Sequence, residues 1–379
     1  WTWDITNIHS YAVDDDVADF IVHLLHRLPA ETQLVLRLAA CIGHKFDLGT
    51  LSTVAERSLD EVLAALWDAL NEGMVQPIQS DGWFEQSAGV AVETSQGDES
   101  DYRFLHDRVQ QAAYSLTPAS DRPLLRLRIG RLLRAKGGLD DPAKRFEVVG
   151  HMNEGAALIE DVAERLELAR LNLDAGRQAK SATAYASAVE VLRAGLRLLP
   201  ADAWQSEYAM TMGLHAECAE CEYLAGNFSE SESLFRESLR SARDRLDSAA
   251  LYSVRMRLYQ VAGRYAEGVE LAAQALSLFE IHLPLSAGDA QEQFQVEQRE
   301  IPLHMADRSI EALLDAPLML EPAARAVLTL LADCAPCAYI SRPELFPLVT
   351  MRMLNWSLRH GNSEASCFAY SVYAVMLAN

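Results

Sequence analysis

The chain has 379 residues, which is enough for two or three domains with buried cores. Its 33 basic and 54 acidic residues give a net charge of -21, which repels the phosphates of nucleic acids and of anionic lipid surfaces. No uninterrupted apolar run approaches the ~20 residues that a membrane-spanning helix needs, and the N-terminus lacks a secretion signal. We therefore expect no nucleic-acid partner and no membrane insertion, and we predict a soluble, cytoplasmic protein.

Residues 1–29 are predicted to form a linker and a lead-in helix. Three acidic residues, Asp14 to Asp16, favour the positive end of a helix dipole, and an apolar stripe follows from Val17 to Leu28. Pro29 is expected to end this helix.

Three helices are predicted next, at 30–42, 48–55 and 59–71. Asp47 is placed to cap the second helix, and Ser58 with Glu61 forms a capping box for the third. Strands are expected at 74–79 and 102–105, joined by a polar loop. Three helices followed by a two-stranded wing define a winged helix, a relative of the helix-turn-helix.

The charges of this predicted winged helix argue against DNA binding. Its third helix carries Asp60, Glu61, Asp68 and Glu72 without a single Lys or Arg. The expected wing loop, residues 80–100, is also acidic and lacks basic residues. A phosphate-lined groove would repel both segments, so we expect this module to dock against protein.

The segment from Phe104 to Tyr114 joins a strand end, a polar His106–Asp107 pair and a new helix within eleven residues. Asp107 is expected to cap that helix. An imidazole can donate a hydrogen bond to a phosphate oxygen, and the bond strengthens when the ring is protonated. The alternative is that His106 merely joins strand to helix.

A basic helix is predicted between residues 120 and 136, against the acidic background of the chain. It interleaves aliphatic residues with Arg122, Arg126, Arg128, Arg131, Arg134 and Lys136. Such a helix can lie on a membrane or bind a partner. We favour a third role, in which it pairs internally with neighbouring carboxylates and connects two domains.

An internal repeat appears in the second half of the chain. The sequence from Tyr223 through Gly226 to Phe228 recurs from Tyr259 through Gly263 to Tyr265, and the glycines are 37 residues apart. That period is close to the ~34 residues of a tetratricopeptide repeat, in which Gly permits the turn between two antiparallel helices. The pattern predicts an α-solenoid of tetratricopeptide-like helical hairpins over residues 158–379, with Ser231 and Gly268 departing from its small-residue positions.

The C-terminal elements are predicted from helical periodicity and proline positions. We expect a polar loop or frayed helix at 291–300, then helices at 303–314, 322–335, 343–360 and 363–376, with Pro336 as a divider. Two Cys-x-x-Cys pairs, Cys218 with Cys221 and Cys334 with Cys337, could supply four thiolates to zinc. We favour packing, since free Cys behaves as a small buried hydrophobe, and we predict no metal site.

The residues from Phe104 to Tyr114, with the basic helix after them, resemble the winged-helix end of the ATPase module in large bacterial multidomain signalling kinases. These kinases combine serine/threonine kinase, STAND/AAA-type ATPase, tetratricopeptide-like, GAF and histidine kinase domains. Further segments of this chain share the resemblance, namely Trp1–Asp4, Arg27–Thr32, Ala39–Gly43 and Ser357–Ser363.

The resemblance implies a domain order. Residues 30–118 would form the winged-helix domain of a STAND-type ATPase module, 119–157 connecting helices, and 158–379 a repeat domain truncated at its C-terminus. A chain that starts without Met and stops inside a periodic run, at Asn379, fits a segment of a longer protein.

The resemblance also implies a role for the His–Asp pair. Leu105-His106-Asp107 is similar to the Met-His-Asp triplet of STAND ATPases, whose His touches the phosphate of ADP bound to the nucleotide domain. His106 and Asp107 are therefore the expected nucleotide-sensing residues, acting with an ATPase domain outside this sequence.

The expected function is regulatory: coupling the state of an upstream ATPase to downstream kinase output in two-component signal transduction. An equivalent segment of a STAND-type transcriptional activator is the alternative. No G-x-x-x-x-G-K-[ST] loop is present, so we expect no catalysis and no cofactor in this segment, with ATP and ADP serving the parent protein. The expected partners are the flanking kinase and ATPase domains and a protein on the repeat surface.

Overall fold

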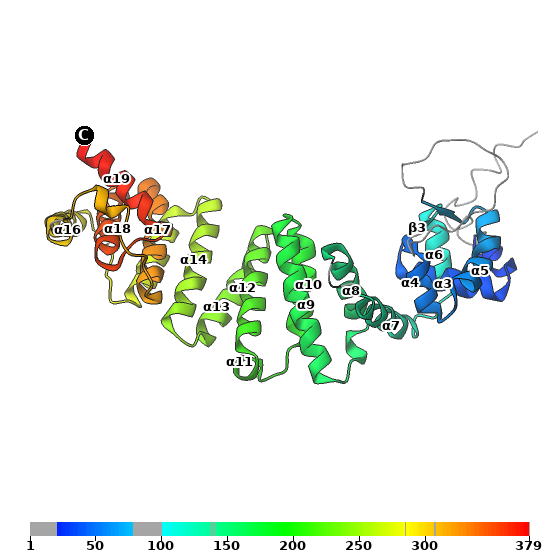
Figure 1. The fold of residues 1–379 in the computed structure, drawn as a ribbon. Coiled ribbons are helices and arrows are strands. Elements are labelled where there is room, and N and C mark those ends of the chain that lie inside the picture. Colours follow the sequence, from blue (N-terminus) through cyan, green and yellow to red (C-terminus); the bar gives the residue numbers. More distant parts are fainter. Residues whose placement is uncertain are drawn as a thin grey trace, which may run out of the picture. The chain divides into compact units, whose positions relative to one another are not determined.

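The computed structural model describes residues 21–78, 101–137, 139, 141–284, 286–306 and 308–378 (Figure 1). The start of the predicted lead-in helix and the predicted wing loop at 80–100 lie outside these ranges; residues 21–27 are helical. The chain divides into two compact units. Unit 1 comprises residues 1–178 and 197–199, and unit 2 comprises residues 179–196 and 200–379.

Unit 1 begins with helices around a small sheet. The elements in chain order are α3 (Ala30–Ile42), β1 (Lys45–Asp47), α4 (Leu48–Ala55), α5 (Leu59–Asn71), β2 (Val75–Pro77), β3 (Asp101–Phe104) and α6 (Asp107–Ser115). The predicted capping box is present: Ser58 and Glu61 exchange side-chain and backbone hydrogen bonds at the start of α5. The apolar face of α5 then buries Val62, Leu66 and Ala69.

The sheet has three strands: the two predicted strands are present as β2 and β3, and β1 is an additional strand that the sequence did not indicate. β3 lies in the middle, antiparallel to β1 on one side and to β2 on the other. The added strand, β1, has only three residues, but its Phe46 is buried and stacks on Tyr102 with ring centroids 6.1 Å apart. A strand this short has no periodicity in sequence, and its burial comes from tertiary packing.

Unit 1 continues with helices α7 (Arg122–Ala135) and α8 (Pro142–Glu154), the 3-10 turn η1 (Ala156–Leu158) and the start of α9 (Val162–Ser181). α7 contacts α3 and α4 as well as α8. Gly130 allows the close approach of α7 and α8, because a Cβ there would lie 2.5 Å from Cγ of Met152.

Unit 2 contains tetratricopeptide-like helical hairpins, as the repeat predicts. After α10 (Tyr185–Leu198) and the short α11 (Ala203–Ser206), α12 (Tyr208–Leu224) pairs with α13 (Phe228–Ser241), and α14 (Arg245–Val261) pairs with α15 (Tyr265–Ser277). Gly226 and Gly263 turn the chain with φ of +90° and +71°, a conformation that other residues adopt only with strain. The 37-residue offset thus marks equivalent turns.

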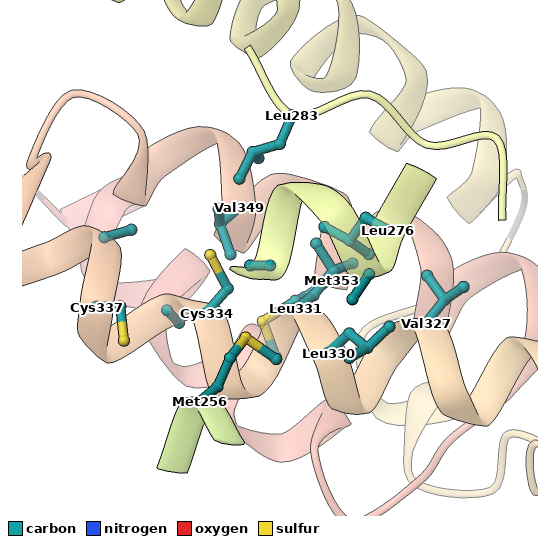
Figure 2. Packing of buried hydrophobic residues seen from close by; sticks show 14 of the residues in the cluster. Met256, Leu276, Leu283, Val327, Leu330, Leu331, Cys334, Cys337, Val349 and Met353 are labelled. Atoms are coloured by element: carbon teal, nitrogen blue, oxygen red, sulfur yellow. The ribbon is translucent and has the colours of Figure 1, made fainter. Parts of the chain in front are cut away.

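The C-terminal helices depart from simple hairpin order. They are α16 (Ala287–Met305), the 3-10 turn η2 (Glu311–Leu313), α17 (Pro322–Ser341), α18 (Phe346–His360) and α19 (Ser366–Ala378). α15 packs on α17, whereas α16 packs on α18. Figure 2 shows the shared core of this region, with Met256 of α14, Leu331 of α17 and Met353 of α18 pointing toward one another.

The structure corrects three expectations for this region. Of the two alternatives for residues 291–300, the loop is wrong, since these residues belong to the continuous helix α16, which Ser286 caps and buried Ala290 and Ile301 anchor at its two ends. The helix expected at 303–314 is replaced by the end of α16, a turn and η2. α17 continues through Pro336, since burial on both sides of the proline offsets a cost of about 3 kcal/mol.

α17 is long and largely apolar, although Arg325 and Asp333 interrupt its apolar run. Among the described helices, Pro322–Ser341 is long and apolar enough to cross a membrane, by length and composition alone. Half of its most apolar stretch is buried inside the fold, where α14, α15 and α18 cover it. That burial is typical of a core helix.

Candidate functional site: the strand end at His106 and the basic helix

The end of β3 holds His106 in a defined place. The backbone N–H of Phe104 donates to the carbonyl of His44 at 3.1 Å, and that of Leu105 donates to the carbonyl of Met74 at 3.0 Å. Phe104 itself is fully buried. Backbone hydrogen bonds on both sides of β3 therefore hold the two residues that precede His106.

His106 and Asp107 are both solvent-exposed, and they occupy the start of α6. The helix begins at Asp107 with His106 as its N-cap residue, so the prediction that Asp107 is the cap is wrong. The backbone carbonyl of His106 accepts from the N–H groups of Val109 and Gln110, whereas its side chain makes no capping bond. Asp107 instead stands in the first turn, where a carboxylate is favoured by the helix dipole.

Asp107 has a neighbour that the sequence did not reveal. Its Oδ1 lies 3.2 Å from Nδ1 of His44, within ion-pair distance although out of line for a hydrogen bond. His44 follows α3, and α3 packs against α6. The two residues are 63 positions apart, and the pairing of β1 with β3 and the packing of α3 on α6 bring them together.

Among the described residues, no hydrogen bond or ion pair of the His106 side chain is observed. The side chain is exposed at one end of the sheet and is next in sequence to Asp107, whose carboxylate lies beside His44. An exposed imidazole can donate a hydrogen bond toward solvent or toward a docked domain.

The basic helix α7 is paired within unit 1, as predicted. Arg128 contacts Glu56 after α4, while Arg131 and Arg134 reach Glu164 and Glu167 of α9. Lys136 donates to the backbone carbonyl of Gly49, near the start of α4, at 2.5 Å. The helix therefore uses its cations to join segments on either side of it.

The Arg131–Glu164 pair has the strongest geometry of these contacts. Nε and Nη2 of Arg131 each lie 2.7 Å from a different carboxylate oxygen of Glu164, a bidentate arrangement. These hydrogen bonds hold the pKa of Glu164 below its ordinary value and raise the pKa of Arg131. Glu164 is more buried than Arg131, with side chains 15% and 45% exposed, which protects the pair from part of the solvent screening.

A groove of about 700 Å³ lies beside α7 in unit 1. Three lysines and three carboxylates line it, together with aliphatic residues: Lys45, Lys136, Lys144, Asp47, Asp101 and Glu147. The opposite charges balance, and Lys136 and Asp47 already hydrogen-bond to backbone atoms of α4. The groove therefore lacks the charge excess of an anion site.

All four cysteines of the two Cys-x-x-Cys pairs are fully buried, which agrees with a packing role. Burial raises the pKa of the Cys218 and Cys221 thiols to about 12 and that of Cys337 to about 11, and it also raises the pKa of Cys334. No cluster of three or more His, Cys, Asp or Glu side chains suited to a metal ion occurs within the described ranges.

Comparison with known proteins finds similarity to a signalling kinase in sequence and to a STAND protein in structure. The chain is 23% identical over its whole length to hybrid signal transduction histidine kinase G of Dictyostelium discoideum, and it spans 13% of that protein. It also aligns with the crystal structure of a STAND protein with a tetratricopeptide repeat sensor from Pyrococcus horikoshii, at 14% identity. That alignment covers 93% of this chain and 45% of the other, with a TM-score of 0.37. No model of a protein family matches.

Proposed function

We propose that this chain is a regulatory and protein-interaction segment of a multidomain signal-transduction kinase, in which a winged-helix-like module reports the state of an ATPase and helical hairpins carry that state to kinase output. The observation that carries the proposal is the similarity to a hybrid signal transduction histidine kinase along the entire chain. Because the relative named is a histidine kinase, we favour this function over a STAND-type transcriptional activator.

The element order of unit 1 supports the winged-helix part of the proposal. A helix, a short strand, two helices and two further strands follow one another from α3 to β3, and the three strands form one antiparallel sheet. The acidic α5, which occupies the place of a DNA-recognition helix, favours docking onto protein.

His106 is the residue proposed to sense nucleotide. Its ring is exposed at the end of a strand that is fixed by the carbonyls of His44 and Met74. A nucleotide domain docked on this end would place a phosphate of ADP within reach of the imidazole, which can donate a charge-assisted hydrogen bond. Asp107, near His44, would keep the local charge balanced.

The basic helix and the hairpins supply the proposed path from this module to the output domains. α7 connects the sheet-bearing part of unit 1 with α9 through three Arg–Glu pairs, to Glu56, Glu164 and Glu167. A displacement of the module would strain these contacts before any others on the helix. The hairpins of unit 2 provide the surface on which kinase domains or partners would bind.

The test uses the full parent protein loaded with radiolabelled ADP. We expect His106→Ala to speed ADP release about tenfold, the effect of losing one charge-assisted hydrogen bond of roughly 1.4 kcal/mol. His26→Ala is the matched control, because His26 is equally exposed and only its backbone carbonyl accepts a hydrogen bond. The 379-residue chain alone should neither hydrolyse ATP nor phosphorylate itself.

Two results would refute the proposal in different ways. Unchanged ADP release in the His106 variant would remove the sensing role and leave the interaction role standing. ATP turnover by the isolated chain would contradict the non-catalytic assignment itself.

A further inference from the structure

The segment between α16 and α17 carries a dense set of exposed aliphatic side chains. Four large residues there have side chains that are between 72% and 87% exposed: Ile310, Leu314, Leu318 and Leu320. Leu303, near the end of α16, is 76% exposed. A folded chain hides most such side chains, and isolated exposed ones are ordinary. Four within eleven residues form a contiguous surface of the kind that marks an interaction site.

The backbone turns these four side chains outward while their neighbours point inward. Ile310 and Leu314 flank the 3-10 turn η2 and are both exposed, whereas Leu313 between them packs against the core. Leu318 and Leu320 flank Met319, which is 2% exposed. Alternation along an extended strand therefore places both leucines on the opposite side from Met319.

Asn362 brings the two halves of this surface together. Its Nδ2 donates to the carbonyl of Leu313 at 2.8 Å, its backbone N–H donates to Pro317 at 2.8 Å, and its carbonyl accepts from Met319 at 2.8 Å. The residues adjoining these contacts, Leu314 and Leu318, thus lie around one asparagine. Tyr370 holds Asn362 from the other side, donating to its Oδ1 at 2.8 Å.

The charges around the surface are mainly acidic. Glu311, Asp315, Glu321 and Glu364 are all exposed, and the exposed Arg325 lies one turn after Glu321 on α17. Arg308, in the segment itself, is turned inward and donates to the carbonyls of Met305, His304 and Leu358. Within the described residues, the ion pair of Glu321 is to His360, whose Nδ1 lies 3.8 Å away. Four exposed carboxylates against one exposed arginine give the rim an acidic excess.

We propose that Ile310, Leu314, Leu318 and Leu320, here called the leucine surface, form a docking site for a basic amphipathic helix of a partner protein. Such a helix supplies aliphatic side chains for the centre and Lys or Arg for the acidic rim. A second copy of this chain would bring two acidic rims face to face, and these would repel each other. An anionic membrane would likewise repel the acidic rim. The site does not depend on the nucleotide-sensing role of His106.

The test measures binding of a fluorescein-labelled Leu/Lys amphipathic helix of about 18 residues, or five turns, to the full chain by fluorescence anisotropy. A matched peptide has Glu at every Lys position. We expect the basic peptide to bind, the acidic one to bind at least tenfold more weakly, and added salt to reduce the difference. Leu314→Ser with Leu318→Ser should weaken binding of the basic peptide about tenfold or more, as for two hot-spot residues.

Matched controls separate this surface from general stickiness. Val162→Ser with Val261→Ser removes two exposed valines elsewhere, and Glu190→Lys with Glu270→Lys reverses two exposed acids elsewhere. Both controls should bind as the unaltered chain does, whereas Glu311→Lys with Asp315→Lys should weaken binding and flatten its salt dependence.

Three outcomes would overturn the proposal. The first is equal binding by the control and leucine-surface variants. The second is a self-associated chain that becomes monomeric in sedimentation only when Leu314 and Leu318 are replaced, which would make a second copy the occupant. The third is that the chain with Leu314→Ser and Leu318→Ser loses binding to anionic lipid vesicles but keeps its binding to the basic peptide, which would make a membrane the occupant.

Discussion

We predict that the close packing of α15 on α17 requires glycine at position 268. A double-mutant cycle can measure the coupling energy between this position and Cys337. A Cβ at this position would lie 2.5 Å from Sγ and 3.4 Å from Cβ of Cys337. Carbon and sulfur atoms in contact normally stand at least ~3.5 Å apart, so the methyl group overlaps the sulfur by roughly 1 Å. Cys337 is fully buried on α17, so its sulfur cannot relieve the overlap by turning into solvent.

The expected magnitude follows from two opposing effects. Gly→Ala inside a helix ordinarily stabilises by about 1 kcal/mol, and overpacking a buried contact costs about 1–3 kcal/mol. We therefore expect Gly268→Ala to lower the free energy of unfolding by about 1 kcal/mol in the unaltered chain. In a Cys337→Ala background the sulfur is gone, and the same change should stabilise, which gives a coupling energy of about 1–3 kcal/mol.

Urea denaturation followed by circular dichroism at 222 nm measures all four corners of the cycle. Gly288→Ala is the control, because a Cβ there meets nothing within 4 Å. It should show no coupling to Cys337. A Gly268–Cys337 coupling below about 0.5 kcal/mol would refute the claim that the close approach of α15 and α17 requires glycine.

Three further predictions concern charge, thiols and capping. Arg131 donates to Glu164 and thereby lowers the pKa of this carboxyl in the folded state. The pair therefore stabilises the fold fully above the ordinary pKa of 4.5. This stabilisation is lost as the pH falls through the lowered pKa. The stability difference between Arg131→Gln and the unaltered chain should be about 1 kcal/mol or less near neutral pH and should vanish in acid; a constant difference would contradict it. Cys367 is the exposed cysteine and the other five are buried, so Ellman's reagent should label one thiol quickly in the native chain and six in denaturant. Rapid labelling of two or more thiols in the native chain would show that buried cysteines are accessible to the reagent. Ser58→Ala removes the capping box of α5 and should cost about 1 kcal/mol by the same urea assay, whereas Ser229→Ala, where the hydroxyl bonds only the neighbouring exposed Glu230, should cost little.

Local signals in the sequence predicted the parts of the fold that depend on local chemistry. Ser58 and Glu61 are three residues apart, and the capping bonds they form involve only their own turn. Gly226 and Gly263 were recognisable because the positive φ at each turn excludes most other residues. The basic helix was also predictable, since buried or half-buried arginines in an acidic chain find carboxylates.

The features that sequence reasoning missed depend on contacts between distant segments. β1 is a strand only because β3 pairs with it, and the neighbour of Asp107, His44, follows from the same pairing. The polarity of residues 291–300 leaves a loop and a frayed helix both open, and the choice is made by distant partners: Arg352 and Asn355 of α18 donate to Glu297 and hold it in place. The assignments of His106 to nucleotide sensing and of residues 30–118 and 158–379 to separate domains stay predictions.

The exchange of order among the C-terminal helices, with α15 on α17 and α16 on α18, has a consequence for how this region folds. In a regular solenoid each hairpin contacts its sequence neighbours, so units can be added, removed or unfolded one at a time. Here α16 cannot complete its packing until the chain has continued through α17 and returned in α18. Helices α16, α17 and α18 should therefore gain and lose structure in a single cooperative step, and excising any one of these three should unfold the other two.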